Sequence, residues 1–263
     1  MQVRLDAERR YDMPASFGPS AVPDRTVVDG ARALVLTTHT RREAVEPLVP
    51  AHFSVPDRPT LTVAHMHYPD VDYLGGRSYN EIVVSVGAQF GAAGGRIDAA
   101  LAVLLWVDQA GALIAGREYM GFPKLAARIS DLDEAMRFTC AEYDEAIVEG
   151  AARTLSPMGD EQLERLNARA GEVRTFGWKY IAAAGGGSDV DQPLINVMRW
   201  RYDQAWTGEG EFRFIPAAFA DAPMSANAVN ALAALPHEGP VRAFRGIGQA
   251  TIDRTATRRL ERP

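Results

Sequence analysis

The sequence predicts a mainly β (α+β) fold, in which a mostly antiparallel sheet curls or closes into a barrel and carries a few short helices. Three observations predict it: many short segments with strand character, glycine and proline turns between them, and few segments with a helical pattern. The 263 residues are 47% hydrophobic and 24% charged, which is usual for a folded globular chain. Because we find no internal repeat and no low-complexity tract, we expect a single domain over residues 1–263.

The first third of the chain predicts an arm, several strands and one short helix. Residues 1–25 are polar and rich in proline, so we expect an arm that lies on the surface or on a partner subunit. Apolar runs at 27–28 and 33–36 predict short strands, and residues 41–49 predict one or two helical turns that end at Pro50. A further strand is expected at residues 61–68.

The clearest alternation lies at residues 79–90, where Ile82 and Val84 share one strand face and Glu81 points to the other. Glycines at 91–95 predict the turn of a hairpin with a strand at 97–107. More strands are expected at 136–143, 146–154, 173–181, 194–202, 211–215 and 241–252. Helices are expected at 160–169 and 224–235, the second with Ser225 as its N-cap, and Gly185–Ser188 is expected to be a loop.

Charge, hydropathy and cysteine content exclude several classes of protein. The net charge of −6 and a pI of about 5.4 argue against a nucleic-acid partner. The longest apolar run, Ala99–Val107, is much shorter than the roughly 20 residues of a membrane-spanning helix. The N-terminus has no apolar signal core, and the single cysteine, Cys140, fits a reducing compartment, so we expect a cytoplasmic protein with Cys140 in its core.

Lysine is rare in this chain, since 26 of its 28 basic residues are arginine and only Lys124 and Lys179 are lysine. An arginine stays charged, whereas an amine in an apolar environment can lose its proton and attack a carbonyl carbon. Lys124 follows Phe122-Pro123, and the proline restricts the backbone that enters it. If its apolar neighbours enclose the amine, burial favours the uncharged form that makes a Schiff base. The alternative is a surface lysine whose stem covers those neighbours.

Two other groups of residues could carry chemistry. Tyr79 and Glu81 point to the same face of the expected strand, where a phenol and a carboxylate could orient a substrate and transfer protons; the alternative is an exposed strand face. His65 and His67 also share a strand face and could begin the metal site of a cupin-like barrel. A further alternative is a non-catalytic barrel that binds a small molecule.

The most informative segment is Gly116-Arg117-Glu118 followed by Gly121-Phe122-Pro123-Lys124. It resembles the acetoacetate decarboxylase family, in which a Gly-Arg-Glu…aromatic-Pro-Lys segment carries a Schiff-base lysine. The resemblance extends from about residue 30 to about residue 252. Shorter similarities to the family occur at Leu48-Val49-Pro50, at Tyr79-Asn80-Glu81, and at Gln204-Ala205-Trp206-Thr207-Gly208.

The resemblance implies a strongly curved antiparallel sheet that closes into a cone or barrel around the lysine. It also implies a homo-oligomer, which we expect to be a dimer, a tetramer or larger. Lys124 would form the imine without a cofactor or metal, and Glu81 would be the acid or base of the pocket. The expected substrate is a small oxo acid, which either loses CO2 as a 3-oxo acid or enters aldol condensation and dehydration as pyruvate.

The hypothesis of a Schiff-base lysine assigns roles to other residues near Lys124. Tyr79 would orient the substrate, and Met120 and Phe122 would form a dry wall. Arg117 would bind a carboxylate, with an ion pair to a neighbouring acid as the alternative.

Three positions depart from the family pattern. Leu125 stands where the decarboxylases have a second lysine, so that only burial would favour the uncharged amine. His65 and His67 stand where a second pocket glutamate is expected, which makes His65 a candidate for substrate binding. The family's N-terminal pocket arginine falls near Ala31 and Arg32, and Arg32 matches it only with a shift of one residue.

Overall fold

The computed structural model describes residues 4–92, 95–169 and 172–261. In these residues eleven strands form one sheet. The strands are β1 (Arg25–His39), β2 (Thr60–Val71), β3 (Arg77–Ala92), β4 (Gly95–Val107), β5 (Lys124–Ala126), β6 (Arg128–Ile129), β7 (Arg137–Glu142), β8 (Glu145–Pro157), β9 (Val173–Ala182), β10 (Ser188–Phe214) and β11 (Arg242–Arg259).

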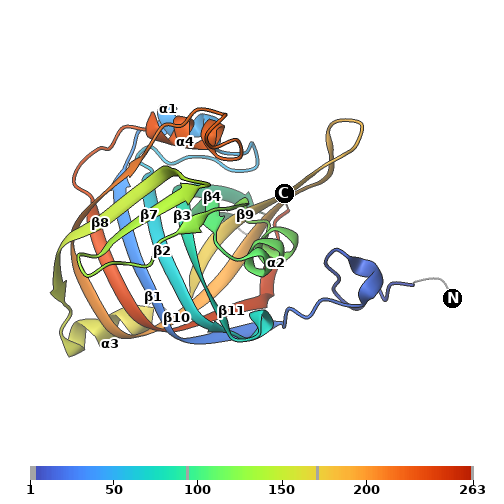
Figure 1. Cartoon of the computed structure of the whole chain (residues 1–263), viewed down its shortest axis with the longest axis horizontal. Helices are drawn as coiled ribbons and strands as arrows, with labels where there is room; N and C mark the ends of the chain where they lie inside the picture. The colour runs from blue at the N-terminus through green and yellow to red at the C-terminus, as the bar shows by residue number, and fades with distance from the viewer. Residues whose placement is uncertain (1–3, 93–94, 170–171, 262–263) are drawn as a thin grey trace.

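Seven of these strands close a ring by hydrogen bonding, which confirms the expected curved sheet (Figure 1). The order is β11, β1, β2, β3, β4, β9 and β10, and β10 pairs back with β11. The far end of β10 leaves the ring and pairs with β8, which continues into β7 and β6. Because β4 pairs in parallel with both β9 and β5, the ring is not a regular antiparallel barrel.

Four α-helices and three 3-10 turns occur in the described residues. They are α1 (Arg42–Val45), α2 (Ala110–Met120), α3 (Asp160–Arg169), α4 (Ala226–Ala233), η1 (Ala15–Phe17), η2 (Glu46–Leu48) and η3 (Asp72–Leu74). The expected helices near residues 41–49, 160–169 and 224–235 are confirmed. The helix α2 was not expected, because Gly111 and Gly116 lower the helix propensity of this segment.

Several details differ from the expectation. The strands expected at 194–202 and 211–215 are parts of the single strand β10, the runs at 27–28 and 33–36 are both in β1, and β11 continues past residue 252. Ser225 makes no side-chain cap bond and instead accepts a hydrogen bond of 2.9 Å from the Trp106 indole. The expected turn at 91–95 includes residues 93–94, which lie outside the described residues, but β3 and β4 pair up to it.

The core lies on both faces of the sheet, as strand alternation requires. On β1, Leu34 and Leu36 belong to the larger hydrophobic cluster, together with the buried Cys140. The residues Ala31 and Ala33 point the other way, into a second cluster that includes Tyr79 and Ala112 of α2. This second face holds the candidate site.

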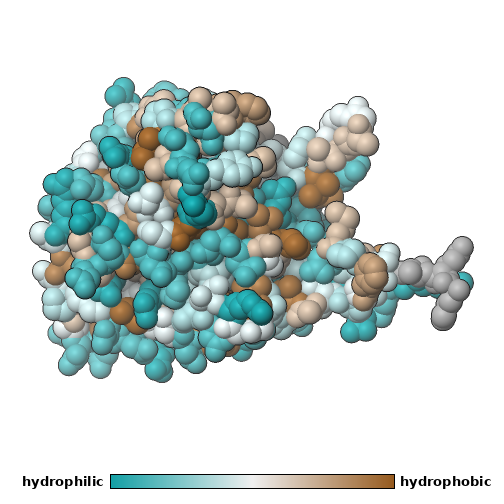
Figure 2. All heavy atoms as spheres, viewed as in Figure 1, coloured by the Kyte–Doolittle hydropathy of each residue, from teal (hydrophilic) through white to brown (hydrophobic). Residues whose placement is uncertain are grey.

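Two segments project from the body of the molecule, the arm at residues 4–24 and the hairpin between β9 and β10 (Figure 1). Both carry exposed hydrophobic side chains, Met13 and Phe17 on the arm and Ile181 on the hairpin (Figure 2). The expected loop at Gly185–Ser188 forms the tip of this hairpin, up to the first residue of β10. None of the described helices is long and apolar enough to cross a membrane.

Candidate active site

Lys124 begins the short strand β5 and is buried, with 5% of its surface exposed. Its Nζ lies 2.8 Å from Oε2 of Glu81 on β3, and Glu81 is buried to the same degree. The strand β4 lies between them, pairing Leu105 with Lys124 on one side and Val107 with Glu81 on the other. The structure therefore brings together the amine and the carboxylate that the sequence singled out.

The helix α2 and the turn after it hold Lys124 in place. An added Cβ at Gly116 would lie 2.5 Å from Cε of Lys124, so the lysine side chain occupies the space that a larger residue would need. The Arg117 guanidinium donates a hydrogen bond of 3.0 Å to the carbonyl of Lys124. Gly121 ends α2 with a left-handed conformation, φ 64°, which glycine adopts readily.

A small cavity of about 20 Å³ lies around the amine, with room for about one water molecule. Most of its wall is apolar or aromatic, so the cavity desolvates any charge inside it. The residues that line it are Tyr73, Tyr79, Glu81, Ala112, Ala115, Gly116, Met120, Phe122, Lys124, Met198, Ile252 and Arg254. Tyr79, Met120 and Phe122 are thus where the sequence analysis expected them.

Tyrosine rings form one side of this cavity. Nζ of Lys124 lies 5.8 Å from the centroid of the Tyr79 ring, which stacks on Tyr68 at 4.8 Å. Burial raises the pKa of Tyr79 well above its ordinary 10.0, and the nearby Glu81 carboxylate adds to the effect. Burial also raises the pKa of Tyr73. Both phenols therefore keep their protons at neutral pH and can donate hydrogen bonds.

Arg254 on β11 places a second cation at the cavity. It is 5% exposed, and its Nη1 donates hydrogen bonds to the carbonyl of Pro23 and to Oγ1 of Thr26. Its buried Nε has no hydrogen-bond partner, and no carboxylate of the described residues forms an ion pair with it. Burial lowers the pKa of this guanidinium, but arginine remains charged in proteins.

A larger cavity of about 540 Å³ shares Arg254 with the small one and is lined by residues such as Arg10, Tyr119 and Lys179. We call it the vestibule. The arm contributes to it, because Arg10 lies over the Tyr119 ring at 5.4 Å and pairs with Asp24. Arg254 therefore stands where the vestibule and the small cavity meet.

Four residues that line the small cavity were not predicted from the sequence: Tyr73, Met198, Ile252 and Arg254. One signal for the last two was present, since Ala250, Ile252 and Arg254 alternate along one strand face. Continuing that alternation by two residues would have placed Arg254 beside the other pocket residues.

Three expected site residues lie elsewhere. The pairing of Met66 with Glu81 turns His65 to the opposite face of β2, where its Nε2 lies 2.9 Å from the Ser130 carbonyl. Arg117 is exposed, does not line the small cavity, and donates its hydrogen bond to the carbonyl of Lys124. Arg32 is also exposed, so it does not stand in for the family's pocket arginine.

The histidines do not form the metal site that was kept as an alternative. His67 faces away from the small cavity, like His65, and its Nδ1 lies 2.8 Å from Oδ1 of Asn80. In residues 4–92, 95–169 and 172–261, no group of three His, Cys, Asp or Glu side chains is placed to hold a metal ion. The pair lacks the further ligands that a bound transition metal needs.

The residue after the lysine has a structural role. Leu125 packs against the larger hydrophobic cluster, on the side of β5 opposite to Lys124, as strand alternation requires. A lysine at this position would thus point away from the amine. The presence of Leu125 in place of a lysine therefore removes no charged group from the immediate surroundings of the Lys124 amine.

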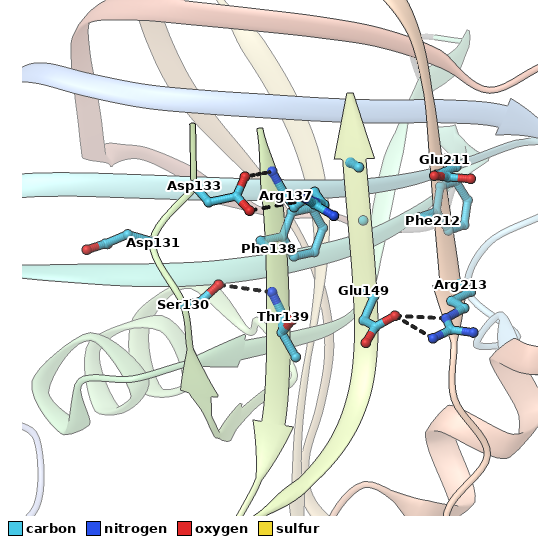
Figure 3. A pocket seen from close by; sticks show the side chains of 12 residues that line it. Ser130, Asp131, Asp133, Arg137, Phe138, Thr139, Glu149, Glu211, Phe212 and Arg213 are labelled. Atoms are coloured by element: carbon cyan, nitrogen blue, oxygen red, sulfur yellow. Dashed lines mark hydrogen bonds and ion pairs between the residues drawn. The ribbon is translucent and has the colours of Figure 1, made fainter. Parts of the chain in front are cut away.

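A wider cavity, about 750 Å³, lies elsewhere, over β7, β8 and the end of β10 (Figure 3). Both arginines that line it pair with carboxylates of the same cavity, Arg137 with Asp133 and Arg213 with Glu149. These pairs leave no unpaired cation or buried amine of the kind that Lys124 and Arg254 provide. We therefore take the small cavity as the candidate active site.

Comparison with known proteins gives one family model and several solved structures. The family model described as acetoacetate decarboxylase (ADC) matches residues 12–247. None of the curated protein sequences matches the chain.

Solved structures share the fold at low sequence identity. An acetoacetate decarboxylase aligns with a TM-score of 0.75 and 14% identity, covering 96% of both chains. The acetoacetate decarboxylase of Legionella pneumophila gives 0.68 and 17%, covering 95% of this chain and 96% of that one. The enduracididine biosynthesis enzyme MppR, in complex with pyruvate, gives 0.65 and 15%, covering 96% and 97%.

Proposed function

The chain belongs to the acetoacetate decarboxylase family, and we propose that it is a carbon–carbon lyase in which Lys124 forms a Schiff base with a small oxo acid. The observation that carries the proposal is the buried contact of 2.8 Å between Lys124 and Glu81 inside a largely apolar cavity. The reaction needs no cofactor, because the imine itself withdraws electrons.

The pair can supply the uncharged amine that the reaction needs. When the Lys124 ammonium gives a proton to the Glu81 carboxylate, two buried charges become none, which relieves their desolvation cost. The amine then attacks the carbonyl carbon of the oxo acid to give a carbinolamine. Glu81 returns the proton to the hydroxyl group, which leaves as water, and the iminium forms.

The iminium can then follow one of two routes. A 3-oxo acid loses CO2, because the electrons of its carbon–carbon bond move into the iminium and leave an enamine. A 2-oxo acid instead loses a proton from the carbon next to the iminium to the Glu81 carboxylate, and the resulting enamine adds to an aldehyde. Both routes have a counterpart among the similar structures, in acetoacetate decarboxylase and in the condensation product bound to MppR.

The other residues at the cavity position and enclose the substrate. The Tyr79 phenol keeps its proton and so orients the substrate by donating a hydrogen bond. Met120 and Phe122 form an apolar wall. The cavity holds about one water molecule, so an oxo acid must displace side chains as it enters. Met120 and Met198 are suited to this, because unbranched thioether side chains change shape easily.

Reductive trapping tests the proposal directly. We expect borohydride in the presence of pyruvate or acetoacetate to attach the ligand to Lys124, as located by peptide mass mapping. Lys179 is an internal control, because it is the only other lysine and its Nζ donates to the Glu118 carbonyl. Equal labelling of both lysines, or none, would contradict the proposal. The variant Lys124→Arg should keep the fold and give no adduct.

The remaining alternative is a non-catalytic binding protein. It predicts that pyruvate raises the unfolding temperature equally in the wild type and in Lys124→Ala, without any adduct.

A cytoplasmic location and a homo-oligomer remain predictions, which fractionation and light scattering would check.

A further inference from the structure

Arg254 is a buried cation that forms no ion pair with a carboxylate in the part of the chain that the structure describes. Its Nη1 donates hydrogen bonds to neutral oxygens, the Pro23 carbonyl and Thr26 Oγ1, and its Nε has no hydrogen-bond partner. Its guanidinium lies over the Tyr73 ring at 5.1 Å. The titratable groups that act on it are Tyr73, Tyr79, Arg10 and Asp72. Asp72 is exposed and accepts a hydrogen bond from Thr26, so it acts on Arg254 without direct contact.

A buried, unpaired guanidinium is costly, and proteins normally pair such a group with an anion. Its planar donors match a carboxylate in two parallel hydrogen bonds. Arg254 lines the small cavity together with Lys124, and it also lines the vestibule. An oxo acid that enters from the vestibule therefore contacts Arg254 no later than its carbonyl group reaches the Lys124 amine.

We propose that Arg254 binds the carboxylate of the substrate and so favours 2-oxo acids, which keep that carboxylate throughout the reaction, over decarboxylation of 3-oxo acids. This inference rests on the proposed Schiff-base function and decides between its two routes. Nothing in the family pattern pointed to this residue, since the expected pocket arginine lay near Arg32.

The preference follows from where negative charge is lost. When a 3-oxo acid loses CO2, the electrons of the breaking bond move to the iminium and the carboxylate becomes neutral. A cation bound to the carboxylate then stabilises the ground state more than the transition state, which slows the reaction. When the iminium of a 2-oxo acid loses a proton from its methyl carbon, the carboxylate keeps its charge, and Arg254 stabilises every stage alike.

The proton step can be measured without an aldehyde. The Glu81 carboxylate takes a proton from the methyl carbon of the iminium, the enamine forms, and return of a deuteron from D2O exchanges the methyl group. Pyruvate and acetone are matched probes, because both have a methyl group beside a carbonyl and only pyruvate has a carboxylate. Proton NMR in D2O follows both.

We expect Arg254→Gln to lower kcat/KM for pyruvate exchange by about 10- to 100-fold, the usual effect of losing a charged hydrogen bond, while acetone exchange stays within about twofold. The retained acetone activity shows that the variant is folded, and Arg254→Lys should recover part of the pyruvate rate. The matched control is Arg199→Gln, which removes an arginine paired with the adjacent Asp253 and should leave both rates unchanged. In the wild type, pyruvate exchange should exceed acetoacetate decarboxylation in kcat/KM.

The outcomes separate this inference from the proposed function. Three results would overturn the role of Arg254 and leave the adduct on Lys124 intact. In Arg254→Gln, these are equal losses of the pyruvate and acetone exchange rates, or no loss of either rate. In the wild type, it is a higher kcat/KM for acetoacetate decarboxylation than for pyruvate exchange. If borohydride gives no adduct and neither probe exchanges, the proposed function itself fails.

Discussion

At the scale of single residues, the site depends on the difference between two lysines. Both belong to a chain that otherwise uses arginine. Lys124 is buried against Glu81, whereas Lys179 is half-buried and donates to a backbone carbonyl. Only the first has a neighbour that can take its proton. The chemistry proposed here therefore belongs to the pair and not to the lysine alone.

Replacing the carboxylate tests the pair. Glu81→Gln keeps the volume and an acceptor oxygen near Lys124 but cannot take up a proton, so we expect kcat for pyruvate methyl exchange to fall by about 10²- to 10⁴-fold. The control is Glu149→Gln, which changes a glutamate paired with Arg213 at the separate cavity over β7 and β8 and should leave kcat unchanged. A Glu81→Gln variant with wild-type kcat would show that another group moves the proton.

The sequence could predict part of this site and not the rest. Glu81 and Tyr79 could be predicted, because alternation along one strand fixes which residues share a face. Lys124 could be predicted, because it is one of only two lysines and follows Phe122-Pro123. His65 was misplaced, because the face of one strand says nothing about the register of the next, and here Met66 is the residue opposite Glu81. Arg254 was missed because its strand was expected to end at residue 252, two residues before it, whereas β11 continues to Arg259.

At the scale of elements, most of the Gly-Arg-Glu…Phe-Pro-Lys segment supports the lysine and does not react. Gly116 makes room for its side chain, Arg117 binds its carbonyl, and Gly121 ends α2 close to the backbone of Lys179. After Gly121, the chain turns through Pro123 and enters β5. The helix α2 and the strand β5 thus together fix the direction in which the Lys124 amine points.

A methyl group added at position 116 of α2 should displace the Lys124 side chain. Gly116→Ala would place Cβ 2.5 Å from Cε of Lys124, so the lysine must move away from Glu81. We expect kcat to fall at least tenfold and the free energy of unfolding to fall by about 1–3 kcal/mol, the usual cost of overpacking. Gly91→Ala is the control, since an added Cβ there meets nothing within 4 Å. Denaturant titration and methyl exchange measure both quantities; unchanged activity in Gly116→Ala would contradict the role given to α2.

Glycines also explain where the element predictions stopped short. Gly208 and Gly210 made β10 look like two strands, because glycine usually weakens a strand interior. In the structure, a Cβ at Gly208 would lie 1.4 Å from the carbonyl oxygen of Thr154. At this point β10 pairs with β8 on one side and with β11 on the other. The glycine therefore marks a close approach of backbones and not the end of a strand.

At the scale of the whole molecule, ring closure is the feature that residue patterns alone left undecided. The strands β10 and β11 meet although the segment with α4 separates them in sequence, and β9 joins β4 only after six intervening strands and helices. Such pairings depend on contacts between distant residues, which local alternation does not encode. The family resemblance did imply ring closure, because it predicts the fold of the complete sheet and not only the local structure of each strand.

The stability of the whole molecule should depend on a histidine outside the site. His65 is 1% exposed, and its ring packs against Phe138 at 5.3 Å. Burial lowers its pKa below the ordinary 6.5, although the hydrogen bond to the Ser130 carbonyl opposes this, and its titratable neighbours are His67 and Asp131. The folded protein therefore resists protonation of His65 more than the unfolded chain does.

The sign of the pH dependence follows from this difference. Above pH 6.5 His65 is neutral in both states and contributes no pH dependence. As the pH falls below 6.5, the unfolded chain binds a proton that the folded protein does not, so the free energy of unfolding falls by up to about 1.4 kcal/mol per pH unit until the folded pKa is reached. His65→Gln keeps a donor for Ser130 and removes the titration. Urea unfolding at pH 8, 6 and 5 should thus show a smaller loss in this variant than in the wild type, because the remaining groups titrate alike in both. If the free energy of unfolding falls equally with pH in the wild type and in His65→Gln, burial does not keep His65 neutral in the folded protein.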